Sequence, residues 1–158
     1  MKIGRQSMYD TFGDKRSLYL EALERYQRES VAENIGRLRS AASPLAGIEA
    51  FVIGIVAADK SARERGCMGV GSISEFGPAD PDLVTLRAKS GGAQHRALVE
   101  RLRDAQAANE VGANVDIVRA ARFLETMMFG LQVAAKAGAS FQSLRDTAAF
   151  TISSLRNH

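Results

Sequence analysis

The sequence predicts an all-α protein. Signals for the start of a helix recur along the chain. In two of them a short polar residue precedes a proline, at Ser43-Pro44 and at Asp80-Pro81. Apolar residues follow these signals at spacings of three and four, and no stretch shows the strict alternation of a strand. A chain of 158 residues is long enough to bury a core as one domain, or as one domain with a small appendage.

The first predicted helix runs from residue 15 to about residue 40. Asp14 is placed to cap it, and an apolar stripe begins at Leu18 and resumes at Val31. Ser43 and Pro44 start the next helix, in which Ile48 and its apolar neighbours form the buried side. One long helix followed by a second helix is therefore expected early in the chain.

The second half contains further helices separated by glycines. A short segment at 67–76 lies between glycines, and a long helix starts at Pro81. Gly91 and Gly92 lie in the middle of that helix, where glycine costs about 1 kcal/mol relative to alanine, so we expect a kink, a close approach or a break. An apolar helix at 115–136, which Gly138 ends, and a last helix after Ser140 complete the chain.

Composition narrows the class of protein. Hydrophobic residues make up 46% and charged residues 25%, the net charge is +3, and there is one cysteine. An internal disulfide is therefore impossible, and a reducing, cytoplasmic location is expected. No apolar run reaches the roughly 20 residues of a membrane span. No spacing of metal ligands is visible, so we expect neither a metal nor a cofactor.

The opening residues suit the major groove of DNA. Arg5, Gln6 and Ser7 are short or polar side chains of the kind that contact base edges at the start of a helix. Tyr9 and Lys15 supply a hydroxyl and a cation for phosphates, and Lys15 lies at the positive end of the next helix. A plain amphipathic helix followed by a cap is the alternative interpretation of this spacing.

The residues Ser7, Met8, Tyr9, Phe12, Lys15 and Leu18 are similar, position by position, to the signature of TetR-type repressors. The resemblance implies a recognition helix at 4–12 and a connector helix within residues 1–40, followed by a ligand-binding and dimerisation domain at 41–158. It also implies DNA contacts by Arg5, Gln6, Ser7, Tyr9, Thr11 and Lys15. Asp10 and Thr11 depart from the aromatic residues or histidine that are frequent at these positions.

The motif begins unusually early in the chain. Repressors of this family place some thirty residues, which form two helices, before it. The sequence therefore resembles a regulator that lacks the first part of its helix-turn-helix head. A helix of about eight residues does not persist alone, so we expect residues 1–12 to be frayed or docked in a non-native place, and operator binding to be weakened.

The middle helices are expected to enclose a pocket for a small apolar or amphipathic effector. Methionines suit such pockets because their side chains repack readily, although the same residues also fill solid cores. The predicted lining consists of Phe51, Ile55, Met68, Ile73, Phe76, Leu86, Phe123 and Met127.

The last two helices predict a homodimer. They are poor in charge, and helices that are apolar around much of their circumference need cover on more than one side. The predicted interface consists of Phe123, Met128, Leu131, Leu144, Ala148, Ile152 and Leu155.

Two reactive side chains leave alternatives open. Cys67 is either an oxidant or electrophile sensor at a helix start or a small buried apolar residue. His95 is either a pocket donor or a surface histidine. Neither belongs to an acid–base pair or an oriented nucleophile, so an enzyme is the least favoured function.

The function predicted from sequence is a ligand-responsive transcriptional repressor that binds an operator as a dimer. The alternative is a ligand-binding or dimerisation module without DNA-binding activity.

Overall fold

The computed structural model describes residues 13–57 and 59–156. Within them, seven helices follow one another and no strand occurs. Their bounds are α2 Lys15–Ser40, α3 Pro44–Gly54, α4 Lys60–Arg65, α5 Met68–Phe76, α6 Pro81–Ala107, α7 Ile117–Lys136 and α8 Phe141–Ser153. The all-α prediction is confirmed. None of the described helices is both long enough and apolar enough to cross a membrane.

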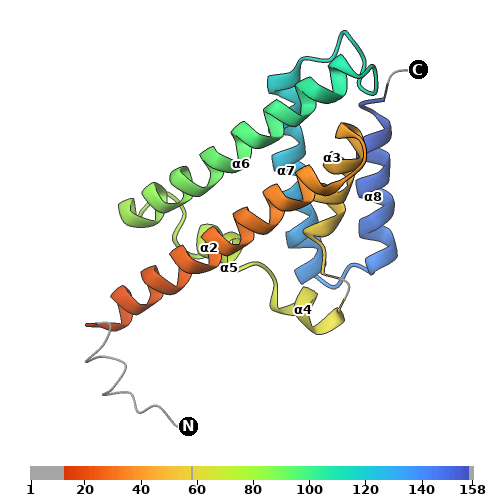
Figure 1. Ribbon diagram of the computed structural model, residues 1–158. Helices are drawn as coiled ribbons and strands as arrows, with labels where there is room; N and C mark the ends of the chain where they lie inside the picture. Colours follow the sequence, from red (N-terminus) through yellow and green to blue (C-terminus); the bar gives the residue numbers. More distant parts are fainter. Residues whose placement is uncertain (1–12, 58, 157–158) are drawn as a thin grey trace.

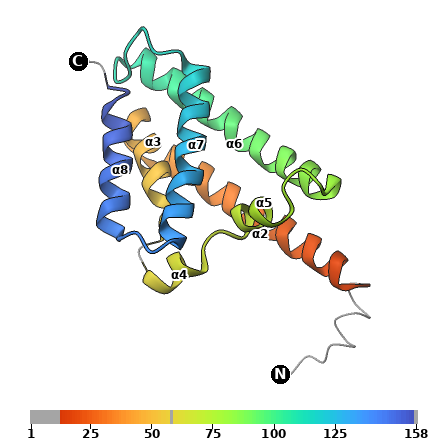
Figure 2. The ribbon, with the colours of Figure 1, turned by 180° about the vertical axis from the view of Figure 1, so that it is seen from behind.

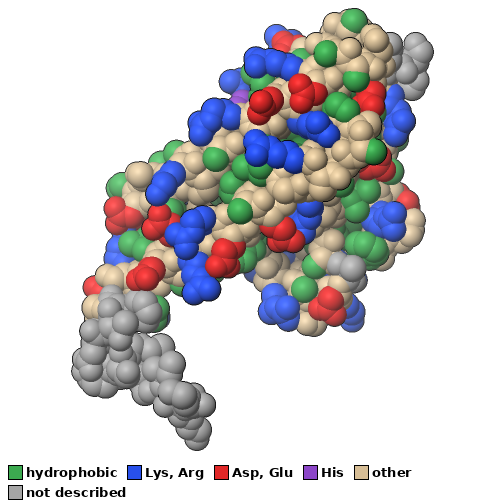
Figure 3. Space-filling model, viewed as in Figure 1, with side chains coloured by type: hydrophobic (Ala, Val, Ile, Leu, Met, Phe, Trp, Pro, Cys, Tyr) green, Lys and Arg blue, Asp and Glu red, His purple; other side chains and the backbone are tan. Residues whose placement is uncertain are grey.

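Two long helices, α2 and α6, lie side by side and extend away from the body of the molecule (Figures 1 and 2). Lys89 of α6 pairs with Glu24 of α2 at 3.0 Å, and the Asn34 side-chain amide donates to Gln94 at 3.0 Å. Positive and negative side chains intermingle along this face (Figure 3). The two helices are thus joined by polar contacts along much of their length.

In the body, α3 packs against the C-terminal halves of α2 and α6, α7 packs against α6, and α8 packs against α3 and α7. Gly47 allows α3 to approach α2 closely, because a Cβ atom there would lie 2.3 Å from the carbonyl oxygen of Leu38. Phe51 on α3 and Leu124 on α7 are fully buried at this junction. The apolar core therefore sits at the end of the molecule far from Lys15 (Figure 1).

Local capping explains most helix boundaries. The predicted caps Asp14, Ser43, Asp80 and Ser140 each accept a hydrogen bond from a backbone N–H in the first turn that follows. Gly138 has a φ of +96° just after the end of α7, a left-handed conformation that glycine adopts without strain. These sequence predictions are confirmed.

Three details differ from the sequence prediction. The helix expected from residue 115 begins at Ile117, because Asp116 accepts from the backbone N–H groups of Val118 and Arg119. The pair Gly91-Gly92 neither breaks nor ends α6, which continues to Ala107. The short helix α4 was not predicted, since its residues form no apolar stripe.

Candidate functional site

A cavity of about 660 Å³ lies between α2, α3, α5, α6 and α7. Its volume is within the range of roughly 300–1,000 Å³ usual for small-molecule sites. Seven of its lining residues come from one stretch of α2 between Tyr26 and Arg37. The apolar part of the lining includes Val31, Ile55, Val70, Ile73, Met128 and Phe129.

Gly91 and Gly92 contribute open space to this cavity. Both line it, and a Cβ atom at position 91 would meet no atom within 4 Å. At position 92 the nearest atom would be Nη1 of Arg96 at 3.5 Å, an ordinary contact. The glycine pair is therefore compatible with larger side chains and leaves room that such side chains would occupy.

One side of the cavity is built from paired polar groups. Nδ1 of His95 lies 3.0 Å from Oε2 of Glu125, which joins α6 to α7 across the cavity wall. The Ser90 hydroxyl donates to Oε1 of Gln27 at 2.6 Å, which joins α6 to α2. Burial, and secondarily the neighbouring Cys67 thiol, raise the pKa of the Tyr26 hydroxyl.

Arg37 crosses the backbone of α3 at the edge of the cavity. A Cβ atom at position 54 would lie 2.5 Å from its Cδ, so glycine at this position allows the side chain to pass. The guanidinium of Arg37 donates to Glu33 and, at 2.9 Å, to Asn34. The charge of Arg37 is thus compensated within α2.

Arg87 and Gln132 carry polar atoms without protein partners. Nη2 of Arg87 donates to the carbonyl oxygen of Gly77 at 2.6 Å, but Nη1 is buried and has no hydrogen-bond partner among the described residues. Oε1 of Gln132 is likewise buried and unpaired there. Buried polar groups are normally satisfied, so both side chains suit a site that receives a polar ligand.

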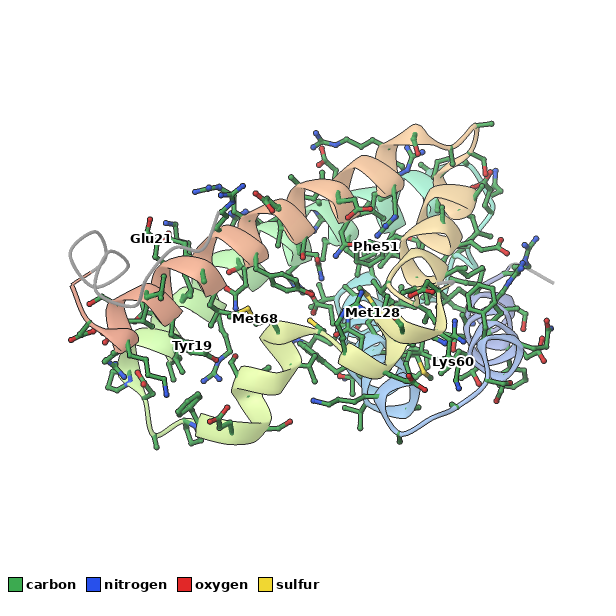
Figure 4. All side chains as sticks on the ribbon, turned by 90° about the horizontal axis from the view of Figure 1, so that it is seen from below. Tyr19, Glu21, Phe51, Lys60, Met68 and Met128 are labelled. Carbon is green, nitrogen blue, oxygen red and sulfur yellow. The ribbon has the colours of Figure 1, made fainter. Side chains whose placement is uncertain are left out.

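The structure brings together only part of the predicted pocket. Ile55 and Ile73 line the cavity. Phe51 does not, because its side chain is fully buried in the core, and Figure 4 shows it in the body with Met128. The remaining predicted residues also lie outside the lining, namely Met68, Phe76, Leu86, Phe123 and Met127.

Other contacts account for some of these side chains. Phe76 packs on Tyr19, with ring centroids 5.9 Å apart, near the N-terminal end of α2. Met127 packs against the outside of the core, and Leu86 borders a separate shallow groove between α2 and α6. Packing therefore accounts for Phe76 and Met127, whereas Leu86 borders a groove.

Most of the polar lining was not predicted from the sequence. Of the two alternatives left open for His95, the pocket is the one that the structure favours: His95 lies in the cavity wall with 34% of its side chain exposed. Cys67 lies at the cap position of α5, is partly exposed and also lines the cavity. One sequence feature could have indicated this polar lining, namely polar residues among the apolar ones on α2 and α6. They are Gln27, Asn34 and Gln94, which all line the cavity.

Six of the seven residues expected at a dimer interface are buried within the chain itself. Met128, Leu131, Leu144, Ala148, Ile152 and Leu155 are at most 5% exposed. The correction has a simple physical reason, since this apolar stripe packs α7 on α6, α8 on α3, and the two helices on each other. Phe123 is the exception, at 46% exposed.

A different apolar set is exposed on the same two helices. Phe129 and Val133 on α7 are 51% and 54% exposed, and Phe150 on α8 is 77% exposed. Helices α7 and α8 lie side by side in both ribbon views (Figures 1 and 2). Large exposed apolar side chains on adjacent helices indicate an interaction surface.

The residues expected to contact DNA lie at the other end of the molecule. Lys15 is exposed and begins α2, next to the cap Asp14. The remaining predicted contacts, Arg5, Gln6, Ser7, Tyr9 and Thr11, lie outside the described residues, as does the recognition helix predicted at 4–12.

No group of three or more His, Cys, Asp or Glu side chains in the described part of the chain is arranged to hold a metal ion. No family model matches the chain.

Known transcriptional regulators resemble the chain over nearly its whole length. It is 32% identical over 146 residues to the HTH-type transcriptional regulator YezE of Bacillus subtilis. This match covers 91% of the present chain and 75% of YezE. It is 25% identical to the HTH-type transcriptional repressor ComR of Escherichia coli, over 92% of this chain and 70% of ComR.

Solved structures agree with these relatives. The reduced form of NemR from Escherichia coli matches with a TM-score of 0.80 at 18% identity, covering 98% of this chain and 81% of NemR, which shows the fold alone. The TetR-family regulator CifR, in a structure with operator DNA, matches with a TM-score of 0.76 at 27% identity, covering 96% of this chain and 80% of CifR. From the length of the match to YezE and the helical architecture shared with these structures, the chain belongs to the TetR family of transcriptional regulators.

Proposed function

We propose that this chain is a ligand-responsive repressor that acts as a homodimer and binds its ligand in the cavity beside α2. One observation supports this most directly: α2 lines the cavity with its middle and C-terminal part and carries Lys15 at its N-terminal end. The resemblance of residues 7–18 to the DNA-contacting signature places the proposed reading residues just before the same helix. A single rigid element thus links the two proposed sites.

The proposed mechanism is a movement of α2. A ligand that wedges between α2, α6 and α7 changes how α2 lies on α6, and the displacement grows along the helix toward Lys15. Half-sites in an operator are separated by about 34–36 Å, so a shift of a few ångströms between two reading helices weakens binding. Such coupling requires that ligand and DNA favour different positions of α2.

The dimer is proposed to form through the exposed apolar side chains of α7 and α8. Phe129, Val133 and Phe150 are exposed in one chain, and a second copy would cover them with the same surface in a two-fold interface. Phe129 also lines the cavity, so ligand and dimer contacts would be adjacent.

The DNA contacts proposed from the sequence remain Arg5, Gln6, Ser7, Tyr9, Thr11 and Lys15. In this proposal Arg5, Gln6 and Ser7 face base edges, and Tyr9 and Lys15 bind phosphates.

The experiment is a DNA-release assay. Compounds that raise the melting temperature are first identified by thermal-shift screening, and each is then titrated into the protein bound to a labelled fragment of its own promoter region at low salt. Release of DNA at concentrations that saturate the protein supports the proposal. Compounds that bind the protein but leave DNA affinity unchanged contradict it. If no promoter DNA is retained at all, a ligand-binding module without DNA binding is the better description.

A further inference from the structure

We propose that the ligand of the cavity is an amphipathic carboxylate, with its carboxylate bound by Arg87 and its hydrocarbon part held by the apolar wall. This inference rests on the proposed function, because it names the chemical class of the effector. Three features of the cavity support it: a guanidinium without a carboxylate partner, partners for the other basic side chains, and an apolar lining.

Arg87 is the uncompensated cation. It lies on α6 in the cavity wall and is partly buried, with Nη1 buried and unpaired. Its Nη2 bonds to the neutral carbonyl of Gly77, and no carboxylate of the described residues lies within 4.0 Å of its guanidinium. An arginine keeps its charge in a protein, so burial without an anion is unfavourable unless a ligand supplies one.

The other basic side chains of the cavity already have partners. Arg37 donates to the Glu33 carboxylate, and His95 lies 3.0 Å from Glu125. Neither needs an anionic ligand. An incoming negative charge is therefore attracted to Arg87 rather than to Arg37 or His95.

The charge of the ligand follows from this arrangement. One available guanidinium balances a single negative charge. A phosphate monoester carries nearly two negative charges, so one of them would stay without a cation. The planar carboxylate also matches the geometry of a guanidinium edge. A monocarboxylate is thus the best match.

The rest of the ligand is apolar. Val31, Ile55, Val70, Ile73 and Met128 offer a hydrocarbon surface, and Gly91 leaves space beside it. A cavity of about 660 Å³ accommodates a medium-chain or aromatic acid. The buried, unpaired Oε1 of Gln132 is a hydrogen-bond acceptor and thereby suits a hydroxyl or amide N–H on the ligand.

The test compares ligands that differ only in charge. Octanoate is compared with 1-octanol, and 4-phenylbutyrate with 4-phenylbutan-1-ol, by isothermal titration calorimetry on the full chain. A charge-assisted hydrogen bond in a partly buried site predicts that each acid binds at least about tenfold more tightly than its alcohol. This comparison needs no variant.

Variants then identify the residue responsible for the preference for acids over alcohols. Arg87→Gln is expected to remove this preference, so that acid and alcohol bind with equal affinity. Arg87→Lys is expected to retain part of it. Arg103→Gln is the matched control, because Arg103 is exposed on the same helix and does not line the cavity. Circular dichroism and melting temperature establish that each variant is folded.

The outcomes separate the two proposals. If the alcohols bind as tightly as the acids, the carboxylate inference is wrong while a ligand-responsive function stands. If Arg87→Gln and Arg103→Gln lower the preference equally, Arg87 does not bind the carboxylate and the inference is also wrong. Acids that bind with the predicted preference but do not release promoter DNA support the inference and contradict the proposed function.

Discussion

Arg16 binds the carboxylate of Asp80 with two hydrogen bonds, from Nη1 to Oδ2 at 2.8 Å and from Nη2 to Oδ1 at 3.0 Å. Asp80 in turn caps α6 by accepting from the backbone N–H groups of Asp82 and Leu83. One carboxylate therefore fastens the N-terminal end of α2 to the first turn of α6. This contact sets the position of the end of α2 that carries Lys15.

This contact predicts a pH dependence of stability. The hydrogen bonds from Arg16 lower the pKa of Asp80 from 3.8 to about 2. Because the folded-state pKa is depressed, the stabilisation is present above the unfolded value and is lost as the pH falls from about 4 through 2. Urea midpoints measured at pH 5 and at pH 2.5 should differ less in Arg16→Gln than in the native protein.

The control for this experiment is Arg25→Gln, which removes an exposed ion pair between Arg25 and Glu29 within α2. Such pairs contribute little, so its pH dependence should match that of the native protein. If Arg16→Gln loses as much stability on acidification as the native protein, the contact between Arg16 and Asp80 does not contribute to stability.

Two glycine-to-alanine changes should have opposite signs. Gly47→Ala places a methyl group 2.3 Å from the Leu38 carbonyl oxygen, and we expect the free energy of unfolding to fall by about 1–3 kcal/mol. Gly91→Ala meets nothing within 4 Å in a helix interior, and we expect a rise of about 0.5–1 kcal/mol. Chemical denaturation measures both. Equal effects of the two changes would mean that α3 does not approach α2 as described.

The exposed apolar side chains predict where a dimer forms. Val133→Asp introduces a charge on the exposed side of α7 and should convert the protein to a monomer by light scattering. Val84→Asp on α6 is the matched control, since Val84 is also exposed, at 40%, but lies on a different helix. A native protein that is already monomeric, or a Val133→Asp variant that keeps the dimer mass, excludes this interface.

The role of Lys15 predicts a characteristic salt dependence. A phosphate contact contributes to affinity for any DNA sequence, so Lys15→Gln should weaken binding to all fragments alike and reduce the slope of log K against log salt by about 1. Lys60→Gln, at an exposed lysine of α4, should leave the slope unchanged. Fluorescence anisotropy at several salt concentrations measures these slopes. An unchanged slope in Lys15→Gln would remove Lys15 from the proposed DNA contacts.

The helices could be predicted from sequence to a large extent, since capping is local. Asp14, Ser43 and Asp80 act within three residues of themselves, so their neighbours in sequence suffice. The helix α4 could not be predicted, because its stability depends on a cap and on tertiary contacts rather than on an apolar stripe.

The residues that line the cavity could be predicted from the sequence only in part. An apolar residue that faces a cavity and one that faces a solid core have the same helical spacing, so Phe51 and Ile55 looked equivalent although the first is core and the second lines the cavity. For the same reason, the inward stripe of α8 with Leu144 could not be distinguished from an outward one with Phe150. These distinctions require knowledge of which helices are neighbours.

The most direct test of the coupling through α2 is the distance between the two copies of position 21 in the dimer, measured by pulsed electron spin resonance. Glu21 is exposed near the N-terminal end of α2 (Figure 4), and it is replaced by a spin-labelled cysteine in a Cys67→Ser background that is first shown to retain ligand binding. Saturation with a ligand that releases DNA should change this distance by a few ångströms. An unchanged distance on saturation would contradict the proposal that the cavity acts on DNA through α2.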